Sequence, residues 1–165
     1  MKTTYERRRV FEAIPVTDLP LPHNPYQCEY HDRFNTLTGH YSLAEGARQF
    51  IASLTRDEVK ACWYHKANWA AIADESARIV EVVGPLQPAG YYIQEARQSN
   101  LGSGDLSWGG DLRWLLSLFE SPIIISGGAY TDGQHRGCAL RFSGAELAAV
   151  VTRYENVALA SRRNY

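Results

Sequence analysis

The chain has 165 residues, a hydrophobic fraction of 45% and a formal net charge of −1. This length allows one domain with a real core, and the near-zero charge provides no general attraction to nucleic acid or anionic membranes. No apolar run approaches about 18 residues and the charged N-terminus lacks an apolar signal core, which predicts a cytoplasmic protein without a membrane span. Three widely spaced cysteines predict a reducing compartment and no disulfide framework.

The N-terminal region begins with a basic triplet, Arg7-Arg8-Arg9, which we interpret as a solvated end rather than a nucleic-acid contact. Residues 10–16 have the pattern of a strand that directs Phe11 inward. Four prolines between positions 15 and 25 exclude a regular helix, so we expect an extended loop there.

A possible metal-ligand cluster lies close to these prolines. Cys28-x-x-His31 has a plausible ligand step, and His23 and His40 are near in sequence. A structural zinc site normally has tightly paired ligands from both halves, which this set lacks. We therefore predict no metal site.

The middle of the chain contains two capping-box patterns, at residues 42–45 and 55–58. Apolar residues at helical spacing follow each of them. They predict consecutive helices over residues 42–54 and 55–73, with Trp63 and Trp69 inside.

Three further segments lead to the C-terminal third. Residues 78–83 predict a strand, and Tyr91-Tyr92-Ile93 predicts either another short strand or a helix through Arg97. Residues 99–110 are rich in Gly and Ser and predict a mobile loop. This loop lacks the Lys-Ser/Thr ending of a Walker motif.

The C-terminal third predicts a helix over residues 111–119 and then two short strands joined by Gly127-Gly128. A further helix opens at Asp132-Gly133 and ends before Gly144, and residues 147–151 predict a last strand. The predicted N-terminus of the helix that opens at Asp132-Gly133 therefore contains a glycine together with polar side chains that can donate hydrogen bonds.

The turn that opens this helix favours an anion. Unpaired backbone N–H groups and the helix dipole provide partial positive charge, and a glycine allows a ligand to approach the backbone. Gln134, His135 and Arg136 add donors, and Arg136 can hold two phosphate oxygens. We expect Arg136 to be exposed and to contact phosphate directly; the rival interpretation pairs it with an internal carboxylate. Cys138, one turn later, is expected to be a small core residue.

A family resemblance adds to this interpretation. Ile14-Pro15-Val16-Thr17-Asp18-Leu19-Pro20, followed by Asn24-Pro25-Tyr26-Gln27, resembles the opening box of ParB N-terminal domains. Residues 122–151 resemble the closing part of the same fold, which ParB shares with sulfiredoxin and a family of free-serine kinases. Asp132 to Arg136, Asp-Gly-Gln-His-Arg, also resembles the signature of a family linked to DNA modification systems.

The resemblance implies an α+β fold of one domain, residues 1–165, with a small mixed sheet and surrounding helices. Its core would comprise residues 10–30 and 110–153, with residues 40–98 as a helical insertion and 99–110 as the mobile loop. It also implies that the Gly-x-x-Arg turn binds the phosphates of a nucleotide (ATP, ADP or CTP), with Mg²⁺ as a possible companion. The nucleotide-binding residues would be Gly133, Gln134, His135, Arg136 and Gly137.

The sequence departs from the resembled families at important positions. The catalytic cysteine of sulfiredoxin corresponds here to Gln134, which argues against sulfiredoxin chemistry. The arginine that follows the Pro-Tyr-Gln segment in ParB corresponds to Cys28 or Glu29. Partition-site binding is therefore not expected.

Two functional hypotheses follow. The first is a small NTP-dependent phosphotransferase or NTPase with an acidic residue as general base. Its candidate catalytic residues are Asp132, His135, Asp18 and Glu29, and its available acids are Glu12, Asp18, Glu29, Asp32 and Asp132. The second is a non-catalytic module that senses a nucleotide or grips nucleic-acid phosphate within a plasmid, phage or DNA-modification system. Both hypotheses take a nucleotide or phosphorylated small molecule as partner; neither fixes the oligomeric state.

Overall fold

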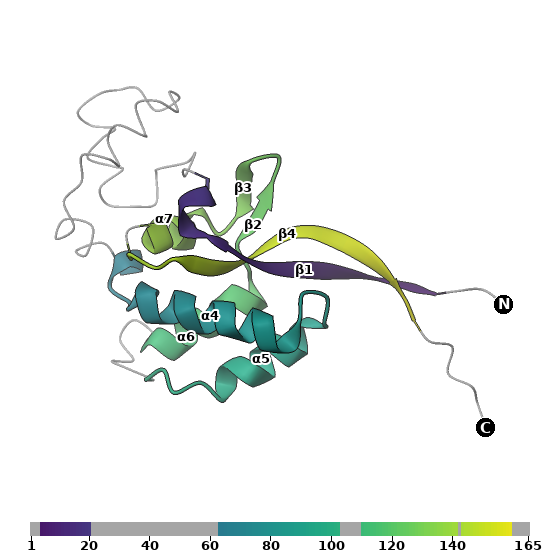
Figure 1. Ribbon diagram of the computed structural model, residues 1–165, viewed down its shortest axis with the longest axis horizontal. Helices are drawn as coiled ribbons and strands as arrows, with labels where there is room; N and C mark the ends of the chain where they lie inside the picture. The colour runs from purple at the N-terminus through teal and green to yellow at the C-terminus, as the bar shows by residue number, and fades with distance from the viewer. Residues whose placement is uncertain (1–3, 21–62, 103–109, 142, 160–165) are drawn as a thin grey trace.

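The computed structural model describes residues 4–20, 63–102, 110–141 and 143–159. Within them the fold is α+β, as predicted: a four-stranded mixed sheet and helices packed around it (Figure 1). The strands are β1 (Tyr5–Pro15), β2 (Ile124–Ser126), β3 (Ala129–Asp132) and β4 (Leu147–Ala158). The helices are α4 (Trp69–Val83), α5 (Ala89–Arg97), α6 (Gly110–Glu120) and α7 (Gln134–Arg141), with short 3-10 turns η1 (Val16–Asp18) and η3 (Trp63–His65).

The sheet has the order β1-β4-β2-β3. β1 pairs antiparallel with β4, β2 pairs antiparallel with β3, and β2 runs parallel to β4. The first and last strands are therefore neighbours, and the predicted strand at residues 10–16 and the predicted strand pair lie in one sheet. Gly127 and Gly128 join β2 to β3 with φ values of +59° and +77°, a conformation that favours glycine at both positions.

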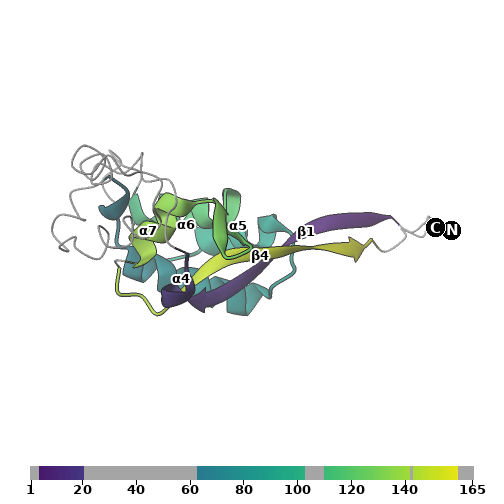
Figure 2. The same cartoon turned by 90° about the horizontal axis from the view of Figure 1, so that it is seen from above.

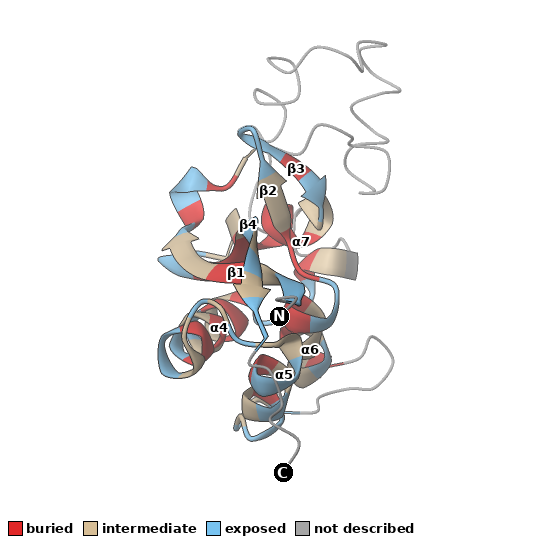
Figure 3. Ribbon diagram, turned by 90° about the vertical axis from the view of Figure 1, so that its right-hand side faces the viewer, coloured by how far each residue is buried: buried red, intermediate tan, exposed pale blue. Residues whose placement is uncertain are grey.

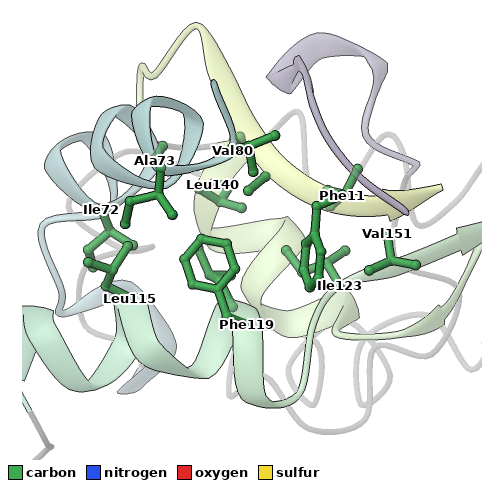
Figure 4. Close-up of a cluster of buried hydrophobic side chains, with 14 of the residues drawn as sticks. Phe11, Ile72, Ala73, Val80, Leu115, Phe119, Ile123, Leu140 and Val151 are labelled. Carbon is green, nitrogen blue, oxygen red and sulfur yellow. The ribbon is translucent and has the colours of Figure 1, made fainter. Parts of the chain in front are cut away.

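The core lies between the sheet and the layer formed by α4, α5 and α6 (Figures 1 and 3). Phe11 of β1 packs against Tyr92 and Phe119, with ring centroids 4.5 and 5.5 Å apart respectively. Figure 4 shows Ile123 and Val151 beside Phe11 in the same cluster. This core holds in place the end of α6 and the start of β2, and the β3–α7 turn packs against these two segments.

Several sequence predictions about these elements are wrong. Residues 78–83 are the end of α4 and not a strand, because Ile72, Ser76 and Ile79 recur at helical spacing and are all buried. The described part of the predicted helix over 55–73 is interrupted, since α4 begins only at Trp69 with Asn68 as its N-cap. Residues 91–93 lie in a helix, which is the second of the two alternatives.

The outer ends of the sheet extend further than the sequence predicts. Residues 5–9 and 154–158 are strand residues that pair with each other, and Arg7 in the basic triplet is exposed to solvent. Other predictions are confirmed, including the helix near 111–119, the helix opened at Asp132-Gly133 and the burial of Cys138. The predicted helix over 42–54 and most of the loop 99–110 lie outside the described residues, as does the His23, Cys28, His31 and His40 set.

A buried hydroxyl ties the helical layer to the sheet. Ser76 on α4 is fully buried; its Oγ donates to the Ala73 carbonyl (2.8 Å) and accepts from the backbone N–H of Ala149 on β4 (3.2 Å). Without this hydroxyl, the buried N–H of Ala149 loses that acceptor.

Ser76→Ala should therefore lower the free energy of unfolding by about 1–3 kcal/mol, the usual cost of an unsatisfied buried donor. Urea denaturation measures this loss. Ser121→Ala, at an exposed position after α6, is the control and should stay within about 0.5 kcal/mol of the parent. Equal effects of the two substitutions would contradict the role of the Ser76 bridge.

Candidate functional site

The β3–α7 turn is built around Gly133. Its φ of +77° is in the left-handed region, and a Cβ there would lie 2.8 Å from the Cα of Ile123. Any side chain would therefore be both strained and too close to backbone. The N–H of Gly133 donates to the carboxylate of Asp132 (2.7 Å), and the N–H of Gly137 makes a helical bond to the Gly133 carbonyl (2.9 Å).

A cavity of about 310 Å³ lies at this turn. It is lined by residues of η3, β3 and the first turn of α7: Tyr64, Tyr130, Thr131, Asp132, Gly133, Gln134, His135 and Arg136. First-turn N–H groups of a helix have no carbonyl one turn earlier to bond, so α7 presents donors at this end. Four of the five predicted nucleotide-binding residues therefore share one cavity.

Arg136 is placed differently from the sequence prediction. It is only 9% exposed, and its Nη1 donates to the Ser117 carbonyl in the last turn of α6 (2.6 Å). The prediction of an exposed arginine is therefore wrong, because the C-terminus of α6 covers it. Among the described residues, Ser117 is the hydrogen-bond partner of Arg136, and none of their carboxylates forms the ion pair that the rival interpretation expects.

The charge of Arg136 is incompletely compensated. Burial lowers its pKa from the usual value, and the nearby Asp132 carboxylate opposes this shift. The C-terminus of α6 stabilises a cation, whereas the N-terminus of α7 disfavours one. Among the described residues, no acceptor hydrogen-bonds to its Nη2 or Nε, and the side chain lines the cavity.

Two aromatic residues that the sequence analysis did not single out also line the cavity, Tyr64 and Tyr130. The Tyr64 ring stacks on His135 with centroids 4.8 Å apart and an interplanar angle of 25°. Tyr130 is buried, which raises its pKa well above the usual range. No residue of the described part accepts from or donates to Tyr130 Oη or His135 Nε2. Buried polar atoms of this kind normally have a partner, so both are candidate ligand contacts.

His135 gives the site a pH dependence that can be measured. Burial first, and then the Arg136 charge, lower the pKa of His135 below 6.5. The unfolded chain then binds more protons than the folded chain just below pH 6.5, so stability falls as the pH decreases through that value.

His135→Gln should flatten this dependence because glutamine does not titrate. Urea midpoints measured over a series of pH values from neutral to acid should fall less steeply in the variant than in the parent. Identical slopes in both proteins would show that His135 is not the titrating group.

Two other candidate acids, Asp18 and Glu12, do not line the cavity. Asp18 is exposed in η1. Arg141 of α7 connects that helix to η1 by donating to the Thr17 carbonyl (3.3 Å) and to the Leu19 carbonyl. Glu12 accepts from Thr152 Oγ1 (2.8 Å), a hydrogen bond that lowers its pKa. Glu29 lies outside the described residues, so Asp132 is the acid that the described cavity contains.

Gly137 is in the turn but has a packing role. A Cβ at this position would lie 2.2 Å from Tyr130 Oη, so the tyrosine occupies the space that a side chain would need. The neighbouring sequence gave no signal for this contact, because Tyr130 is seven residues away on another element.

Comparison with known proteins finds no matching family model, no matching curated protein and no matching solved structure. In the described part of the chain, no helix has both the length and the apolar character needed to cross a bilayer. The same residues contain no group of three or more His, Cys, Asp or Glu side chains arranged to hold a metal ion.

Proposed function

We propose that the chain binds the phosphate of a nucleotide or phosphorylated small molecule in the cavity at the β3–α7 turn. The observation that carries this proposal is the buried guanidinium of Arg136, which has no carboxylate in contact among the described residues. Buried charges in proteins are normally paired. An anionic ligand would supply the pair, and it would also meet the N–H groups and the dipole of α7.

The chemistry of the cavity favours phosphoryl transfer from an NTP, to a small molecule or to water. Asp132 lines the cavity and would act as general base beside a bound phosphate, and the lowered pKa of His135 favours its neutral form near pH 7. In place of the base role, Asp132 would hold Mg²⁺ together with phosphate oxygens where the nucleotide binds with that ion, and the ion would neutralise phosphate charge there. The bound Mg²⁺ would thereby reduce the electrostatic repulsion between the Asp132 carboxylate and an anionic ligand.

The fold that we propose for this function is that of ParB N-terminal domains and sulfiredoxin. Two observations support it: β1, which ends in the first resembling segment, and β4, which begins in the second, are neighbours in one sheet, and the β2–β3 hairpin leads directly to the helix with the Gly-x-x-Arg turn. A fold likeness does not determine the reaction, which depends on the cavity residues.

A second candidate is a module that binds a nucleotide or nucleic-acid phosphate without chemistry. It is favoured by the single carboxylate among the described residues of the cavity, since phosphoryl transfer commonly needs separate groups for metal and nucleophile. In this alternative Asp132 serves only to cap the turn through the Gly133 N–H.

A thermal-shift screen of ATP, ADP, CTP and phosphorylated metabolites, with and without Mg²⁺, tests the proposal. We expect at least one phosphate compound to raise the melting temperature, and its unphosphorylated analogue to have no effect. Turnover of that compound, lost in Asp132→Asn, would favour the enzyme. Saturable binding without turnover would favour the second candidate, and the absence of any phosphate-dependent shift would reject both.

A further inference from the structure

The outer parts of β1 and β4 form a two-stranded arm, residues 5–9 and 154–158. Figures 1 and 2 show it extending beyond the helices, away from the body of the molecule. The pairing runs from Tyr5 opposite Ala158 to Arg9 opposite Tyr154, and the N–H of Leu159 donates to the Thr4 carbonyl (2.9 Å) at its tip. The arm belongs neither to the cavity nor to the core.

The two faces of the arm have different charge. Residues directly opposite each other in an antiparallel pair share a face. One face carries Tyr5, Arg7, Arg9, Tyr154, Asn156 and Ala158, with no carboxylate, and we call it the arginine face. The other face carries Arg8 and Arg153, which are ion-paired with Glu6, Glu12 and Glu155 at 2.5–2.9 Å.

The groups of the arginine face are open to a ligand. The Arg7 guanidinium lies over the Tyr154 ring at 4.5 Å from its centroid, and neither Arg7 nor Arg9 has a carboxylate partner among the described residues. Tyr5 is 62% exposed and Tyr154 is 39% exposed. Alternate residues of a strand are roughly 7 Å apart, so the two guanidiniums can contact successive phosphates of one chain.

We propose that the arginine face binds single-stranded nucleic acid. Arginine pairs with phosphate, and exposed tyrosine rings stack on bases without regard to sequence. Bases are available for such stacking in a single strand and are covered in a duplex. With two arginines, the contact is weak, independent of sequence and sensitive to salt. This function is separate from the phosphate site at the β3–α7 turn.

Fluorescence anisotropy of a labelled oligothymidylate, titrated with the full chain between about 50 and 200 mM salt, tests this proposal. Each phosphate contact to a single strand contributes about 0.7 to the slope of log affinity against log salt. The double variant Arg7→Gln/Arg9→Gln should therefore reduce the slope by about 1.4. Tyr154→Leu should weaken binding by about fivefold and leave the slope unchanged.

The matched control is Arg8→Gln/Arg97→Gln, which removes the same charge from the opposite face and from the exposed end of α5. It should retain the parent slope, and Arg7→Lys/Arg9→Lys should also retain it. Melting curves verify that each variant is folded. Equal slope losses in both glutamine variants, tighter binding to the matching duplex, or no binding at the lowest salt would each overturn the proposal. Sedimentation that shows an arm-dependent dimer without oligonucleotide binding would also overturn it, in favour of a second copy of the chain.

Discussion

Arg136→Met should weaken phosphate binding by about ten- to a hundredfold and leave the unfolding free energy of the ligand-free protein within about 1 kcal/mol of the parent. A hydrogen bond to a charged group contributes about 1.5–3 kcal/mol, which accounts for the affinity loss. Replacing a buried charge by an apolar side chain of similar length is often neutral or stabilising. The Ser117 carbonyl keeps the Ser121 N–H as a donor (3.1 Å), so it is not left unpaired.

Calorimetric titration with ATP and urea denaturation of the same preparations measure the two effects. Arg136→Lys should recover part of the affinity, because lysine keeps the charge and loses the planar fork. The control is Arg113→Met, which removes an exposed arginine that is ion-paired with Glu120 and does not line the cavity. Unchanged affinity together with a large loss of stability in Arg136→Met would assign Arg136 a structural role and reject the phosphate site.

The position of the β3–α7 turn could be predicted from sequence because its signals are local. Gly127-Gly128 set the hairpin, and Gly133 marks a position where only glycine fits. The burial of Arg136 could not be predicted, because it depends on Ser117 of α6, nineteen residues earlier in the chain. Tyr64 was missed for the same reason, since it meets His135 only in the folded chain.

The strand predicted at residues 78–83 shows how a local signal can mislead. Ile79, Val80, Val82 and Val83 have strand propensity, but tertiary packing overrides propensity. The longer spacing from Ile72 through Ser76 to Ile79 is helical and identifies the buried face of α4.

The arm was missed because its strands lack the apolar alternation that usually reveals a strand. Arg7, Arg8 and Arg9 are polar on both faces, and their strand conformation depends on pairing with residues 154–156 at the other end of the chain. Such a long-range pairing has no signal within either segment alone.

Gly137→Ala should destabilise the protein by about 1–3 kcal/mol, although alanine is the better helix former by about 1 kcal/mol. The added Cβ would lie 2.2 Å from Tyr130 Oη and 2.5 Å from Cζ. Tyr130 is 4% exposed, so relieving this clash requires its ring to leave its packed position beside α7. Gly90→Ala is the matched control, since a Cβ in that helix meets nothing within 4 Å and should be neutral or stabilising.

A double-variant cycle with Tyr130→Leu decides whether the ring is the cause. Leucine lacks the Cε1, Cζ and Oη atoms that the new Cβ would meet, so Gly137→Ala should cost little in that background. We expect a coupling free energy above about 1 kcal/mol, measured by urea denaturation of the four proteins. Tyr130→Phe should rescue less, because Cζ and Cε1 remain at 2.5 and 2.7 Å. Strictly additive losses would show that Gly137 is needed for its backbone and not for the space that Tyr130 fills.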